Sequence, residues 1–92
     1  MEKDLSSLRK EINKIDNKLL ELISARMKIA KKVGKYKKRK KIRIHHPERE
    51  KEILITLKQE ARNKDIDAKL VDSVFKHIMT HSRKIQSKET GK

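Results

Sequence analysis

The segment LRKEINKIDNKLLELISARMKIAKKVGKYK, from Leu8 to Lys37, decides the fold of this chain. Its apolar residues recur in alternating steps of three and four, the spacing of one stripe along a long α-helix. Position 26, where the stripe calls for a leucine, holds an arginine. A guanidinium on a buried seam costs on the order of several kcal/mol unless an anion or acceptor meets it. Arg26 therefore predicts a carboxylate nearby, from the protein or from a ligand. The stripe comprises Leu5, Leu8, Ile12, Ile15, Leu19, Leu22, Ile29 and Val33.

The composition indicates one small domain, residues 1–92, that needs a partner. Only 34% of the 92 residues are apolar, and Tyr36 and Phe75 are the only aromatic ones. This is little material for a compact core, so a second copy is expected to complete it. The absence of cysteine fits a reducing cytoplasm. The sequence has neither a signal peptide at its start nor a run of roughly 20 apolar residues, so we predict a soluble, cytoplasmic protein with no membrane span.

The formal net charge of +14 favours anionic partners. Much of the excess lies in KKVGKYKKRKKIR, residues 31–43, where nine of thirteen residues are Lys or Arg. Such a tract can bind phosphates non-specifically. A solvated basic face explains most of these lysines equally well.

Helical periodicity and the scarce glycine and proline residues predict three helices and no strand. At about 1.5 Å per residue the first helix is roughly 55 Å long, whereas a compact chain of this size has a radius of gyration near 12 Å. Its apolar stripe should therefore pack against the same helix of a second subunit. Gly34, inside this helix, marks either a close approach of another backbone or a weak point. The expected boundaries are Asp4 to Lys40 with Asp4, Ser6 or Ser7 as cap, a break from Lys41 to His46, Pro47 to Asn63, a third helix after Asp65 or Asp67 as cap, and a frayed end at SKETGK.

Polar residues interrupt the apolar faces at several points. Ser82 and Gln86 continue the apolar face of the third helix one turn apart, and Glu50 lies on the buried side of the second helix beside Arg49. Lys37 lies on the stripe of Arg26, about 16 Å along the axis. Each of these residues alone has an ordinary structural explanation, but together they predict a polar site.

Arg9 cannot join that site from its own helix, because it lies about 25 Å from Arg26 along the axis and is rotated by about 100°. If two long helices pair antiparallel across a two-fold axis, Arg9 can enter the partner's site, and two equivalent sites form per dimer.

These motifs resemble those of the all-helical class of chorismate mutases. The resemblance covers Leu8 to Gln86. It is carried by an L-R-x-x-I-x-x-I-D-x-x-L-L-x-L-I-x-x-R run followed by V-G-x-x-K, by PERE at residues 47–50, and by Ser82 and Gln86. It implies an all-α, three-helix subunit with a long first helix in an intertwined homodimer, whose two sites each borrow an arginine from the neighbour.

The resemblance also implies roles for individual residues. Arg9 of one chain and Arg26 of the other hold the two carboxylates of chorismate, supported by Arg49 and Ser82. Lys37 and Gln86 reach the ether oxygen of the breaking bond, and Glu50 the ring hydroxyl. The expected catalytic residues are Lys37, Gln86 and Arg26. The family usually has an aspartate three residues before the arginine of the PERE segment, but this chain has His46, where substrate contact is expected to come largely from the backbone.

The implied reaction is the pericyclic (Claisen) rearrangement of chorismate to prephenate in aromatic amino acid biosynthesis. It needs no nucleophile, metal or cofactor, because a site can act by holding the reactive conformer and by stabilising charge on the ether oxygen. The adjacent His45 and His46 point in different directions, and no further ligand spacing completes a metal site.

Two alternatives remain open from the sequence. An isochorismate pyruvate-lyase looks similar and uses the same cationic cage, although the V-G-x-x-K and P-x-R-E context favours the mutase. A non-enzymatic, basic helical protein that binds nucleic acid would use residues 31–43. The near absence of aromatic residues for stacking argues against nucleic acid as a partner, and this alternative leaves Arg26, Ser82 and Gln86 unexplained.

Overall fold

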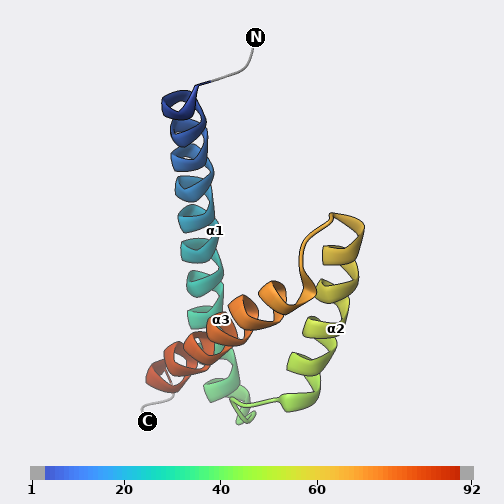
Figure 1. Ribbon diagram of the computed structural model, residues 1–92. Helices are drawn as coiled ribbons and strands as arrows, with labels where there is room; N and C mark the ends of the chain where they lie inside the picture. The colour runs from blue at the N-terminus through green and yellow to red at the C-terminus, as the bar shows by residue number, and fades with distance from the viewer. Residues whose placement is uncertain (1–3, 90–92) are drawn as a thin grey trace.

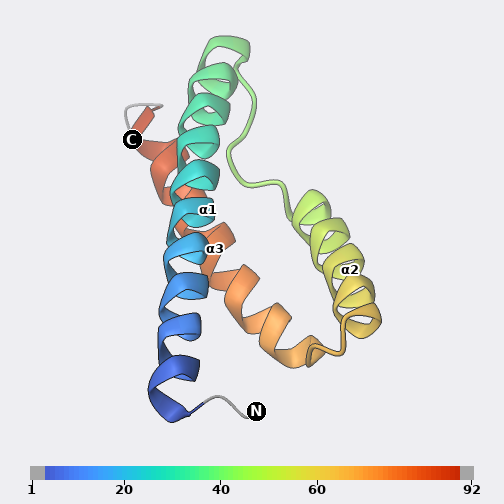
Figure 2. The same cartoon turned by 90° about the horizontal axis from the view of Figure 1, so that it is seen from above.

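The computed structural model describes residues 4–89, which form three α-helices and no strand. Helix α1 spans Leu5–Lys40, α2 spans Pro47–Asn63 and α3 spans Ala68–Glu89. Figures 1 and 2 show α3 crossing the C-terminal half of α1, with α2 joined to the start of α3 and standing apart from α1. The predicted all-helical class is confirmed.

The helix ends follow local chemistry. The Asp4 side chain accepts a hydrogen bond from the backbone N–H of Ser7 at 2.8 Å and so caps α1. This bond lowers the pKa of Asp4. Helix α1 ends at Lys40, and its C-cap residue Lys41 adopts the left-handed conformation with φ 57°. Pro47 occupies the first turn of α2. Two residues were predicted as the cap of α3, Asp65 and Asp67, and the Asp67 carboxylate accepts a hydrogen bond from the backbone N–H of Lys69 at 2.9 Å.

The expectation of a frayed C-terminal end is wrong for part of that segment. Residues 87–89 continue α3 to Glu89, because this last turn packs against α1 and Glu89 forms an ion pair with Lys31 at 3.8 Å. The remaining residues of the predicted frayed end, 90–92, lie outside the described part of the chain.

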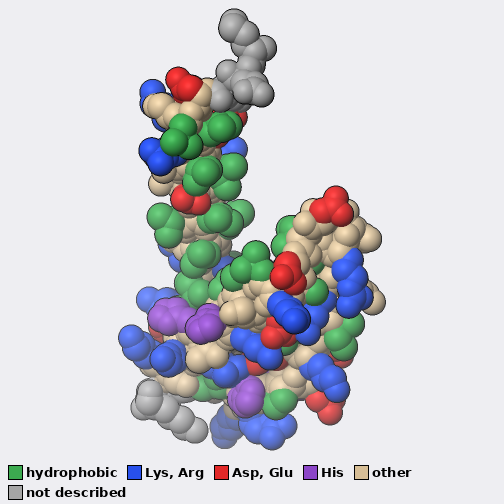
Figure 3. Space-filling model, in the orientation of Figure 1, with side chains coloured by type: hydrophobic (Ala, Val, Ile, Leu, Met, Phe, Trp, Pro, Cys, Tyr) green, Lys and Arg blue, Asp and Glu red, His purple; other side chains and the backbone are tan. Residues whose placement is uncertain are grey.

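The chain is elongated, and the N-terminal half of α1 has no neighbouring helix within the described part of the same chain. The radius of gyration is 16.8 Å, against about 12 Å for a compact chain of this length. Within residues 4–89, α3 approaches both other helices, but α1 and α2 do not approach each other. Figure 3 shows hydrophobic side chains gathered along the projecting half of α1. Its exposed apolar residues include Leu5, Leu8, Ile12, Ile15, Leu19, Leu20 and Leu22, with Leu22 68% exposed.

The interior of a single chain is small. Ala30 on α1, Ala61 on α2 and Met79 on α3 are the buried apolar residues of the described region, and no large side chain there is fully buried. The buried polar residues are Ser82 and Gln86. The small interior of the described region therefore contains polar side chains as well as apolar ones.

Gly34 marks the closest approach of α1 and α3. A Cβ atom at this position would lie 2.8 Å from the Cα atom and 3.1 Å from the carbonyl oxygen of Gln86. Of the two explanations that the sequence left open, close backbone approach is the one the structure supports. The glycine allows α3 to carry Gln86 directly against α1.

None of the helices in residues 4–89 is both long and apolar enough to cross a membrane.

Candidate functional site

A pocket of about 340 Å³ lies where α3 crosses α1, next to the loop that leads into α2. Its wall includes side chains from all three helices and from the loop. Of the eight residues singled out from the sequence, seven line this pocket: Arg26, Lys37, His46, Arg49, Glu50, Ser82 and Gln86. The eighth, Arg9, is exposed on the projecting half of α1 and is not part of the lining.

Arg26 and Ser82 form a polar pair between α1 and α3. The guanidinium Nη1 of Arg26 donates to the Ser82 Oγ atom at 2.6 Å. Ser82 is 6% exposed, and its hydroxyl has the Met27 sulfur at 4.0 Å as a weak acceptor. The acceptor that Arg26 meets in the protein is thus a neutral hydroxyl rather than a carboxylate. The guanidinium keeps its other donors and its full charge for an anion in the pocket.

Lys37 joins the last turns of α1 to the loop before α2. Its ammonium Nζ donates to the carbonyl oxygen of Ile44 at 2.7 Å, which leaves two N–H donors for a ligand. Partial burial lowers the pKa of Lys37, and the negative charge of Glu50 opposes that shift. The structure therefore holds a half-buried cation at one end of the pocket.

Gln86 contributes an amide from α3. Its side chain is 8% exposed, and its Oε1 atom is buried without a hydrogen-bond partner among the described residues. A buried polar atom without a partner costs about 1–3 kcal/mol, so this amide is suited to a ligand that satisfies it. The two ends of an amide differ by a half-turn, so either its oxygen or its NH₂ group can face the pocket.

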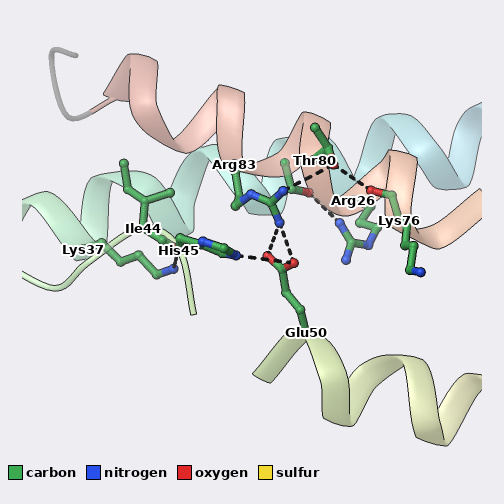
Figure 4. A network of polar contacts seen from close by, with 9 residues as sticks. Arg26, Lys37, Ile44, His45, Glu50, Lys76, Thr80 and Arg83 are labelled. Carbon is green, nitrogen blue, oxygen red and sulfur yellow. Dashed lines mark hydrogen bonds and ion pairs between the residues drawn. The ribbon is translucent and has the colours of Figure 1, made fainter. Parts of the chain in front are cut away.

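Glu50 and Arg49 lie in the first turn of α2. The Glu50 side chain is only 23% exposed and is bound by Arg83 of α3 (Figure 4). Arg49 pairs with Glu52 at 3.9 Å and is 64% exposed, so this contact leaves it largely solvated. His46 precedes α2, and its side chain makes no hydrogen bond that caps the helix.

Arg83 is the functional candidate that the sequence reasoning missed. It lines the pocket, and its Nη1 atom donates to both carboxylate oxygens of Glu50. A signal was present, because position 83 lies four residues after Met79 on the apolar face of α3. Like Arg26, Arg83 is an arginine at a position on an otherwise apolar helix face.

The charges in the pocket favour an anionic ligand. Arg26, Lys37, Arg49 and Arg83 are its cationic side chains, and Glu50 is its acidic one. Guanidinium groups suit carboxylates because two parallel N–H donors match two oxygens. Such a wall, with a hydroxyl and an amide beside it, can bind a small dianion and orient its neutral oxygen atoms.

The chain matches known proteins along most of its length. The chorismate mutase type II family model matches residues 8–87. A chorismate mutase of Methanocaldococcus jannaschii is 34% identical over 82 residues, which cover 89% of this chain and 83% of that protein. The bifunctional chorismate mutase/prephenate dehydratase of Aquifex aeolicus is 48% identical over 50 residues, or 54% of this chain and 14% of that protein. The T-protein of Haemophilus influenzae is 35% identical over 78 residues, or 85% of this chain and 21% of that protein. The chain thus spans only a small part of these last two relatives.

Proposed function

The chain belongs to the chorismate mutase type II family, and from this premise we propose how its pocket turns chorismate into prephenate. The enzyme is an isomerase of aromatic amino acid biosynthesis. The observation that carries the proposal for its site is the convergence of Arg26, Lys37, Ser82 and Gln86 on one pocket, although they come from distant parts of the sequence.

The two carboxylates of chorismate are held by the cationic wall. Arg26 binds one of them, and its hydrogen bond to Ser82 at 2.6 Å fixes the guanidinium in place. Arg49 lies on the same wall and is 64% exposed, so it can turn toward the substrate at little cost. Holding both ends of a flexible dianion selects the compact conformer in which the new bond can form, and that selection removes part of the barrier.

The ether oxygen of the breaking bond gathers negative charge in the transition state. Lys37 and Gln86 are the donors for this oxygen. The Lys37 ammonium keeps two N–H donors free, and the buried Gln86 amide can present its NH₂ group to the ether oxygen when its two ends are exchanged by a half-turn. A donor that is already in position, as the Lys37 ammonium is, acts without reorganisation and so stabilises the transition state more than the ground state. Glu50 accepts from the ring hydroxyl, and the backbone around His46 closes the pocket on that side.

The active enzyme is an intertwined homodimer that works in the cytoplasm. Contiguous apolar surface on this scale is rare on a monomer, and the stripe from Leu5 to Leu22 is exposed in a single chain. A second α1 packed antiparallel covers it and brings the partner's Arg9 to the pocket as the second carboxylate ligand. The absence of cysteine is consistent with a reducing compartment. Residues 1–92 act as one domain.

The lyase alternative uses the same cage, and the family match favours the mutase. Supplying purified chorismate and isochorismate separately distinguishes the two: prephenate from chorismate is expected, and salicylate from isochorismate with no prephenate contradicts the proposal. A nucleic-acid binder predicts tight duplex binding with a steep dependence on salt, and no mutase activity.

Two substitutions test the site. Arg26→Ala and Lys37→Ala should each abolish turnover of chorismate, while circular dichroism and sizing still report a folded helical dimer. A near-normal rate in either variant means that the site is wrong.

A mixed dimer tests the shared arginine. Chains with Arg9→Ala and chains with Arg26→Ala should each be inactive alone. When the subunits exchange, a heterodimer holds one site with both arginines intact, so activity should return to about half per heterodimer. If no activity returns after exchange has been demonstrated, Arg9 does not act across the dimer.

A further inference from the structure

We propose that Arg83 is a positioning residue, which holds the Glu50 carboxylate where it accepts a hydrogen bond from the ring hydroxyl of the substrate. The inference rests on the proposed function, from which it takes the role of Glu50. It adds to that function a residue that none of the sequence motifs contains.

The guanidinium of Arg83 is held by hydrogen bonds to two other side chains. Its Nη1 atom donates to both oxygens of Glu50, and its Nη2 atom donates to the Thr80 hydroxyl at 3.3 Å. Thr80 in turn donates to the carbonyl oxygen of Lys76 at 2.9 Å, within α3. Figure 4 shows Arg83 and Glu50 pointing toward each other from α3 and α2. A charge-assisted pair held at a third point restricts the rotamers of both side chains.

Arg83 and Glu50 lie between two pockets, at the edge of the candidate site. Arg83 and Glu50 line the pocket that holds Lys37 and Gln86, and they also line a second hollow on the other side, together with His45 and Leu54. Their side chains are 28% and 23% exposed, so the pair is screened only in part. Glu50 is therefore part of the pocket wall and is not a fully solvated side chain where it contacts a bound ligand.

The placement of Glu50 depends on α3. Within residues 4–89, α2 has no close approach to α1, on which Lys37 lies. Three polar contacts hold α2 and its loop: Glu50 to Arg83, Lys58 to Asp72 at 2.9 Å, and the Lys37 ammonium to the loop carbonyl of Ile44. Only the first of these acts on the carboxylate itself. His45 lies at 4.0 Å from the same carboxylate but is 58% exposed, so it restrains Glu50 little.

Arg83 acts through Glu50 and not on the substrate carboxylates. Its Nη atoms are engaged by Glu50 and Thr80, whereas Arg26 faces the pocket with a neutral partner. Turning Arg83 toward a ligand would leave Glu50 as an unpaired negative charge beside a dianion, which repels it. The paired arrangement satisfies Glu50 and leaves its remaining lone pairs for a hydroxyl donor.

The test compares two substrates, chorismate and a chorismate analogue that lacks the ring hydroxyl. Arg83→Ala should lower kcat/KM for chorismate about ten- to hundredfold, the range expected for losing one hydrogen bond to a charged group. Most of that loss should be absent with the analogue. Arg83→Lys should restore part of the rate, because an ammonium keeps the charge but not the fork of donors. In a Glu50→Gln background, Arg83→Ala should have little further effect, since both substitutions remove the same interaction.

Lys58→Ala is the matched control, because it removes the other ion pair between α2 and α3 away from the pocket. It should leave kcat/KM at the wild-type value, while denaturant unfolding reports any loss of stability. If Arg83→Ala does not fold, Arg83→Lys carries the same comparison between the two substrates. Equal losses on both substrates, or additive losses with Glu50→Gln, overturn this inference while the wild-type enzyme remains a mutase. A wild-type chain that does not turn over chorismate overturns the proposed function, and the role of Arg83 with it.

Discussion

Replacing Gly34 with alanine tests the contact on which the site depends. The added Cβ atom would lie 2.8 Å from the Cα atom of Gln86 and 3.1 Å from both its carbonyl oxygen and the Cβ atom of Glu89. Ordinary contacts begin at 3.4 Å, so the two backbones must separate by about 0.6 Å, the difference between 2.8 Å and 3.4 Å. The nearest atoms belong to the backbone, so no side-chain rotation relieves the clash.

Two opposing terms decide the effect on stability. Alanine gains about 1 kcal/mol over glycine inside a helix. Overpacking a tight contact costs typically about 1–3 kcal/mol. We expect Gly34→Ala to change the free energy of unfolding by between about zero and 2 kcal/mol, in the destabilising direction. Urea unfolding followed by circular dichroism measures it.

The effect on turnover should be larger than the effect on stability. Gln86 moves with the α3 backbone, and a misplacement near 1 Å can cost about a hundredfold in rate. We therefore expect kcat to fall about tenfold or more in a steady-state assay of chorismate consumption. Lys35→Ala, at the exposed neighbouring position, controls for helix propensity and should keep the wild-type kcat. A Gly34→Ala enzyme that is stabilised by about 1 kcal/mol with unchanged kcat would show that α1 and α3 do not approach each other in this way.

Three further predictions follow from the structure. Burial lowers the pKa of Lys37, so kcat/KM should fall as pH rises through a value below the ordinary lysine pKa of about 10.4; a flat profile to about pH 11 would contradict this. Leu19→Lys, in the exposed stripe, should give inactive monomers on a sizing column, whereas Lys18→Ala beside it should leave an active dimer. The hydrogen bonds that lower the pKa of Asp4 stabilise the fold above the unfolded-state pKa and are lost as pH falls through the lower folded-state pKa. Asp4→Ala should thus lower the urea midpoint at neutral pH, and its difference from wild type should shrink as pH falls below the ordinary aspartate pKa of about 3.9.

Local rules predicted most of the helix boundaries. The apolar periodicity and Pro47 fixed the first two helices to within a residue or two, because each signal acts within one turn. The choice among Asp4, Ser6 and Ser7 required the structure, since all three can cap a helix. The C-terminal end was predicted as frayed because its local composition is polar. Contacts with Gly34 and Lys31 on α1 order residues 87–89, and a reading of the last helix alone does not include them.

The candidate site was predictable where a polar residue interrupts an apolar face, as at Arg26, Ser82 and Gln86. The partners of these residues were not, because they depend on how the helices cross. Arg26 was expected to meet a carboxylate of the protein or of a ligand; its partner within the described chain is the Ser82 hydroxyl, and a ligand carboxylate stays a prediction. Arg83 interrupts a face in the same way, but its pairing with Glu50 requires α2 and α3 to lie side by side.

The partners of the four cations in the pocket show which of them remain for a dianion. Arg83 is engaged by the carboxylate of Glu50, and Lys37 donates to the backbone carbonyl of Ile44. Arg49 is mostly solvated. Among the three guanidinium groups of the pocket, only Arg26 is half-buried with a neutral partner, so within residues 4–89 one firmly held guanidinium is available for two carboxylates.

A single chain is therefore short of one fixed arginine, and the same chain leaves uncovered the apolar stripe of α1, beside which Arg9 lies. In the proposed homodimer, a second copy would remove both deficits at once, because an antiparallel α1 would bring Arg9 as it buries the leucines. Activity and dimerisation should then be lost together in Leu19→Lys. An Arg9→Ala chain should instead lose activity while remaining dimeric, and a fully active Leu19→Lys monomer would show that the site is complete within one chain.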